Sequence, residues 1–147
     1  MMVETQTPVK IHLKNKIQVD DEAETYELTL FGTHYRKKNA IYLKYDEVQD
    51  EGTVHTIVKI TNDEAVIIRS GIIKMRLSFQ LSQERNGSHE SGFGHLFLTT
   101  KTKRLQHTEQ NNECEGALHL AYELAMEGTV AGYYEMDIHY EEDMVKK

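Results

Sequence analysis

The sequence predicts an all-β protein: a single antiparallel meander of about eight to nine strands that closes into a β-barrel. Apolar and polar residues alternate with a period of two in one segment after another, most clearly at 9–13, 118–124 and 136–140. Turn residues separate these segments, and no pattern of crossover helices lies between them. Serial hairpins of this kind usually close into a barrel, because closure removes exposed sheet edges.

The predicted strands follow one another with short connections. The lone proline, Pro8, stands at the start of the first strand, where a missing N–H donor is tolerated. Gly71 centres a tight hairpin, and the polar run 109–113 forms a longer loop. We expect nine strands at 8–19, 24–35, 40–46, 53–61, 65–70, 72–80, 93–106, 116–127 and 131–141.

One segment fits two kinds of secondary structure. Residues 117–126 are good helix formers, and some of their apolar side chains would form a helical stripe. The even positions from 118 to 126 are all large and apolar, which is a complete match to a strand. Hairpins on both sides favour the strand.

The hairpin at 65–73 is apolar on both faces. Val66, Ile67, Ile68, Ile72 and Ile73 point to both sides of the sheet, and such runs indicate burial on both faces. Either another segment covers this hairpin, or it forms a subunit interface, for example in a homodimer.

Composition points to one domain over residues 1–147, with an ordered core at about 8–141. Cys114 is the single cysteine, which indicates a reducing compartment, and neither a secretory signal nor a membrane span is recognisable. We therefore expect a cytoplasmic protein with no membrane partner. The net charge of −7 disfavours nucleic acid as a partner.

No motif in the chain indicates catalysis, a cofactor or a metal. His119 and His139 fall on the polar faces of adjacent strands, but two ligands make a weak zinc site. The run 88–90 holds serine, histidine and glutamate, yet sequence neighbours point apart, so a loop is expected there. Carboxylates beside Cys114 disfavour a nucleophilic thiolate.

Four residues are candidates for ligand binding. Arg69 shares the parity of inward residues next to the Gly71 turn, so it needs a carboxylate, backbone carbonyls or an anionic ligand. Closure of the barrel end by hydrogen bonds from Arg69 to strand ends is favoured over contact with a ligand anion. Lys74 follows across the hairpin, and His95 and Tyr122 are expected inside the barrel.

The inward rows are bulky, which fits a packed core and equally fits an apolar cavity. They comprise Tyr26, Leu28, Leu30, Ile41, Leu43, Met75, Leu77, Phe79, Phe93, Phe97, Tyr122 and Ile138.

Several segments resemble the YwiB-like family of Gram-positive bacteria. These are 42–45, 56–60, the Arg-Ser-Gly-x-x-Lys-Met hairpin at 69–75, and the Phe93-Gly94 pair with the leucines that follow it. The resemblance spans about residues 8–141 and implies a calycin-like (lipocalin-like) β-barrel in a family of unknown function. It supplies no site residues. The chain lacks the tryptophan of lipocalins and the Arg-x-Tyr of intracellular fatty-acid carriers.

Three functional hypotheses follow. The first is a module that binds a small apolar or amphipathic ligand in or at the mouth of the barrel, near Arg69. The second is a structural or protein-interaction barrel that uses the 65–73 hairpin or a sheet face. The third is an enzyme whose site is assembled in space.

Overall fold

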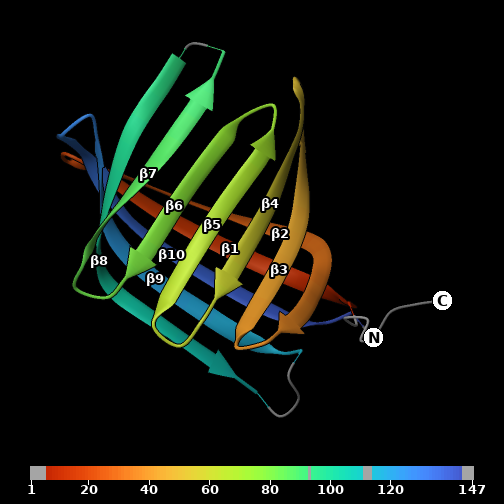
Figure 1. Ribbon diagram of the computed structural model, residues 1–147. Coiled ribbons are helices and arrows are strands. Elements are labelled where there is room, and N and C mark those ends of the chain that lie inside the picture. The colour runs from red at the N-terminus through yellow and green to blue at the C-terminus, as the bar shows by residue number, and fades with distance from the viewer. Residues whose placement is uncertain (1–5, 93, 111–113, 144–147) are drawn as a thin grey trace.

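The computed structural model describes residues 6–92, 94–110 and 114–143. Each strand pairs antiparallel with the next along the chain, and the first pairs with the last, so the sheet closes into a barrel (Figure 1). The predicted all-β meander is confirmed. The strands are β1 (Thr7–Val19), β2 (Glu22–Lys37), β3 (Ala40–Gln49), β4 (Gly52–Ile60), β5 (Glu64–Gly71), β6 (Lys74–Gln80), β7 (Glu84–Ser91), β8 (Gly94–Glu109), β9 (Gly116–Met126) and β10 (Thr129–Glu142).

The described residues form ten strands, whereas eight to nine were predicted. The additional strand is β7, so the expectation of a loop at 88–90 was wrong. This strand is polar and carries no period-2 signal, and it is held by backbone pairing with β8 along its length. The segment 117–126 lies in β9, as its alternation predicts.

The two ends of the barrel differ. The closed end, as we call it, holds the start of β1 and the end of β10, and Asp143 donates its backbone N–H to the Pro8 carbonyl there at 2.9 Å. The mouth is the opposite end, where the hairpin turns of β1–β2, β3–β4, β5–β6, β7–β8 and β9–β10 lie. At the closed end the interior is filled by side chains that are 2% exposed or less, among them Ile11, Leu43, Phe79, Leu118 and Ile138.

The mouth is open on one side because β2 and β3 are not paired there. They pair only between Gly32–Lys37 and Ala40–Tyr45, and residues 22–31 of β2 pair with β1 alone among the described strands. At Gly32 the two backbones are so close that an added Cβ would lie 2.0 Å from the Lys44 carbonyl oxygen. Glycine thus permits the close contact from which the strands diverge.

None of the described residues belongs to a helix with the length and apolar character that a membrane span requires. Phe93, one of the residues expected to point inward, lies outside the described residues.

Candidate functional site

A cavity of about 170 Å³ occupies the mouth of the barrel. It is lined by inward side chains of β1 to β6, β9 and β10, and its apolar wall includes Ile67, Met75, Leu124 and Met136. Because successive residues of a strand point to opposite faces, Ile67 lines the cavity whereas its neighbour Ile68 points outward. We refer to this space as the mouth cavity.

Arg69 lies inside the mouth cavity, as predicted, and its partner is a carboxylate. Its Nη2 donates to Glu47 Oε1 at 2.6 Å, and the two side chains are 26% and 16% exposed. The two residues come from β5 and β3 and reach each other across the inner face of β4. The charge of Arg69 is therefore neutralised by a side chain, rather than by carbonyl groups at strand ends.

Four tyrosines line the same cavity as this ion pair, namely Tyr26, Tyr45, Tyr122 and Tyr134. Tyr122, predicted as a site residue, is buried in the cavity wall, and its ring stacks on Tyr134 with centroids 5.2 Å apart. Burial raises the pKa of Tyr45 and Tyr122, and the nearby Glu47 carboxylate raises the pKa of Tyr45 further. Burial also raises the pKa of Tyr134, so these three phenols stay neutral at physiological pH.

Asn15 and Tyr26 complete the polar part of the cavity wall. Asn15 Nδ2 donates to the Tyr26 hydroxyl at 3.0 Å. Asn15 is only 8% exposed, and its Oδ1 is buried without a hydrogen-bond partner among the described residues. Tyr26 is 45% exposed, because β3 does not cover this part of β2. The amide therefore sits at the boundary between the cavity and solvent.

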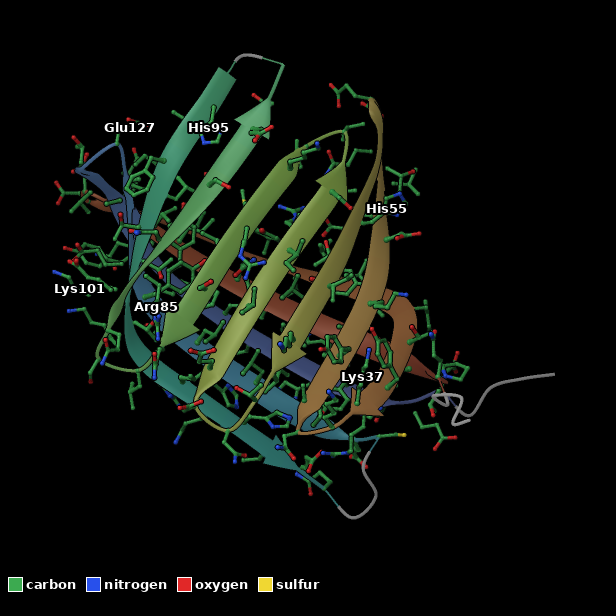
Figure 2. The ribbon with its side chains drawn as sticks, viewed as in Figure 1. Lys37, His55, Arg85, His95, Lys101 and Glu127 are labelled. Carbon is green, nitrogen blue, oxygen red and sulfur yellow. The ribbon has the colours of Figure 1, made fainter. Side chains whose placement is uncertain are left out.

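Lys74 and His95 lie away from the mouth cavity. Lys74 is exposed and faces outward opposite Glu90 of β7. His95 is on the exterior near the β7–β8 turn (Figure 2), its side chain 59% exposed and its Nδ1 3.3 Å from a Glu90 carboxylate oxygen. The inward placement of His95 and Phe97 was wrong, because the buried inward row of β8 runs through the even-numbered residues from Leu98 to Thr102, where a bulge shifts the register.

Sequence reasoning missed two cavity residues that the pattern could have revealed. Asn15 is a polar residue in the otherwise apolar inward row of β1, and Glu47 follows the parity of Leu43 and Tyr45. The signal is a polar side chain in an otherwise apolar inward row, because a polar group that is buried normally has a hydrogen-bond partner or a functional role.

A row of histidines crosses the outer face of β1, β10 and β9. His12 is directly opposite His139, whose ring centroid lies 5.8 Å from that of His119. The prediction that His119 and His139 are cross-strand neighbours is confirmed. Glu27 contacts His12 at 3.0 Å and Asp137 contacts His119, so two of the three imidazole rings already have a carboxylate partner. Within the described ranges, no three potential ligands are arranged to hold a metal ion.

Polar side chains contact one another at the closed end. His107 Nε2 lies 2.9 Å from the Tyr140 hydroxyl, and the Tyr140 ring stacks on His34. Cys114 Sγ is 3.9 Å from His34 Nδ1, and Arg36 forms an ion pair with Glu109. Burial lowers the pKa of His107 and raises that of Tyr140. These groups are packed against one another beside the buried core. A larger pocket of about 510 Å³ also lies at this end, and its lining includes Tyr140 and the histidines His12, His119 and His139.

The outer face of β4 and β5 carries an aliphatic patch of Ile57, Val66 and Ile68. Ile57 is opposite Ile68, and all three side chains are half-buried by their neighbours on the sheet. The sequence left two explanations for the apolar hairpin at 65–73: burial under another segment of the chain, or a subunit interface. No described element covers the hairpin, so the first explanation finds no support in the described residues.

The geometry can now be compared with known proteins. Residues 11–138 match the family model of a domain of unknown function, DUF1934. The chain belongs to this family. The uncharacterised β-barrel protein YwiB of Bacillus subtilis (strain 168) is 34% identical over 136 residues, which is 92% of this chain and 94% of that protein. The crystal structure of YwiB superposes with a TM-score of 0.85 at 33% identity and covers 96% of each chain.

These comparisons confirm the resemblance to the YwiB-like family and the barrel fold. The matched domain is described as one of unknown function, and YwiB as an uncharacterised β-barrel protein.

Proposed function

We propose that this protein is a binding module that takes a small amphipathic molecule into the mouth cavity. The observation that carries the proposal is the contrast along one barrel: side chains fill the closed end, whereas the mouth keeps a cavity with an apolar wall and a few converging polar groups. Apolar cavities with a small number of placed polar groups are the usual form of ligand sites.

The size of the cavity limits the enclosed part of the ligand. Its volume of about 170 Å³ is close to that of an engineered cavity of about 150 Å³ that binds benzene, and below the roughly 300 Å³ at which drug-sized sites begin. A group the size of one ring therefore fits inside.

The rest of a larger ligand would lie on the apolar rim of the mouth. Side chains that share the inward parity are exposed there, namely Val19, Tyr26, Leu28, Leu96 and Met126. Exposed apolar groups around a cavity are typical of ligand-binding surfaces.

Native mass spectrometry of gently purified protein tests this function, with two variants on neighbouring residues. Ile67→Phe fills the cavity, and Ile68→Phe places the same extra volume on the outer face. We expect a bound small molecule on the wild type and on Ile68→Phe, and its loss from Ile67→Phe. A molecule retained by Ile67→Phe, or a bare polypeptide for the wild type, contradicts the proposal.

The aliphatic patch of Ile57, Val66 and Ile68 supports a second candidate function, in which the barrel associates through the outer face of its 65–73 hairpin. No described element covers this patch, and partly exposed aliphatic groups side by side are a common feature of interfaces. Analytical ultracentrifugation tests it in the form of a homodimer. We then expect a dimer for the wild type and a monomer for Ile68→Glu, whereas a wild-type monomer at micromolar concentration contradicts it.

A further inference from the structure

We infer that the mouth cavity selects an electrically neutral ligand that carries a hydroxyl or an amide group, and that it discriminates against carboxylates and ammonium groups. The inference rests on the proposed binding function and specifies the chemistry of the ligand. Three features of the cavity wall lead to it: a satisfied ion pair, an incompletely satisfied amide, and a wall of neutral aromatic rings.

The ion pair disfavours a charged ligand. Arg69 already donates to Glu47 at 2.6 Å, and both side chains are largely removed from water. A carboxylate ligand would have to displace Glu47 from Arg69, or it would lie beside the Glu47 carboxylate as a second negative charge. An ammonium ligand would likewise have to displace Arg69 from Glu47 or lie beside the positive charge of Arg69. Because a charge that leaves water without a partner is costly, either ligand loses affinity relative to a neutral one.

The amide of Asn15 favours a neutral polar group. Its Oδ1 is buried without a partner among the described residues, while its Nδ2 is bound to the hydroxyl of the half-exposed Tyr26. A carboxamide and a phenol side by side both donate and accept hydrogen bonds. The complementary ligand group does the same, which describes a hydroxyl or an amide. A ligand that enters beside Tyr26 would supply the missing hydrogen bond.

The aromatic wall favours a flat apolar body for the enclosed part of the ligand. The Tyr122 and Tyr134 rings are stacked with an angle of 6° between their planes, and Tyr134 is the partly exposed member of the pair. A further ring in the cavity can stack against such a surface, and the volume of about 170 Å³ admits one ring. Ring compounds are therefore suitable probes.

The test compares four compounds with the same ring: benzyl alcohol, ethylbenzene, benzoate and benzylammonium. Their dissociation constants for the wild-type protein are measured at pH 7 by calorimetry. We expect benzyl alcohol to bind most tightly, by about tenfold over ethylbenzene, which is the effect of one hydrogen bond. We expect benzoate and benzylammonium to bind more weakly than ethylbenzene.

Variants then assign the selectivity to residues. Asn15→Leu should remove the preference for benzyl alcohol over ethylbenzene, and Glu47→Gln should strengthen benzoate binding because Arg69 loses its carboxylate. Lys74→Ala is the matched control, since this residue points outward away from the cavity and should leave all four constants unchanged.

The outcomes separate the inference from the proposed function. Equal binding of benzyl alcohol and ethylbenzene, or tightest binding of benzoate, overturns the neutral polar selectivity while small-ligand binding stands. Failure of all four compounds to bind the wild type overturns both, because a cavity of this size and lining would not accept even the apolar ring. The wild-type series decides the question even if a variant does not fold.

Discussion

At the closed end of the barrel, inward side chains fill the interior, whereas at the mouth the same strands leave a cavity beside the stretch of β2 that does not pair with β3. The polar groups follow the same division. At the closed end, His107, Tyr140 and His34 pack on one another, while at the mouth the Asn15 side-chain oxygen has no hydrogen-bond partner among the residues that the structure describes. On the proposed function, one end of this fold provides stability and the other binds the ligand.

Truncation of the core should produce the largest difference between the two ends. Phe79 is fully buried and packs on Tyr122, so Phe79→Ala should lower the free energy of unfolding by about 3–5 kcal/mol. Leu28→Ala at the mouth removes a side chain that is already 37% exposed and should cost about 1 kcal/mol or less. Urea denaturation measures both changes. Equal losses would show that the mouth is as tightly packed as the closed end.

Breaking the ion pair at the mouth should have an intermediate effect. Arg69→Met leaves Glu47 without its partner and should destabilise the fold by about 1–3 kcal/mol, between the effects typical of exposed and buried pairs. In the double variant Arg69→Met/Glu47→Gln, part of this loss should be recovered. Urea denaturation of the wild type, the two single variants and the double variant measures the coupling, and simple additivity would mean that the charges do not interact.

Asn15→Leu should separate stability from function. The substitution removes a buried oxygen that has no hydrogen bond to any described residue, and Tyr26 can turn its hydroxyl to solvent. We expect the free energy of unfolding to stay equal or to rise by about 1 kcal/mol. Thermal unfolding without added ligand is the measurement. A clear loss of stability would assign a structural role to Asn15 and weaken the contrast between the two ends.

The smallest effect concerns pH dependence at the closed end. Burial lowers the pKa of His107 below its ordinary value of 6.5, with smaller effects from Glu109, Arg36 and His34. The unfolded chain therefore binds a proton at a higher pH than the folded protein, so the contribution of His107 to stability is complete above pH 6.5 and is lost as the pH falls through the folded pKa.

Replacement of His107 by Gln should make stability less sensitive to acid in this range. The measurement is the difference in unfolding free energy between wild type and His107→Gln at several pH values, which removes the contributions of the other histidines. A difference that is independent of pH would contradict the burial of a neutral His107.

Alternation of apolar and polar residues was sufficient to predict most strands, because a side chain in a half-buried strand must alternate between core and solvent. It failed for β7, whose polar side chains reveal no buried face, and in β8, where Leu98 points inward although Phe93 and Phe97 had been assigned to the inward row of the same segment. The inward position of Arg69 followed from the same alternation.

The remainder of the site depends on tertiary structure. The pairing of Arg69 with Glu47 requires the registers of β3, β4 and β5, and the cavity requires the separation of β3 from the part of β2 that precedes Gly32. Neither is encoded in a local pattern. The calycin-like character that the family resemblance implies stays a prediction, and so does the identity of the ligand.

Methyl NMR during a titration with benzyl alcohol tests the division between the two ends most directly. Met75, Met136 and Leu124 report on the mouth cavity, while Leu118 and Ile138 report on the closed end. We predict that the methyl resonances of the mouth shift in a saturable manner and that those of the closed end do not move. Shifts at Leu118 and Ile138, or saturation without any change at the mouth, would contradict the account.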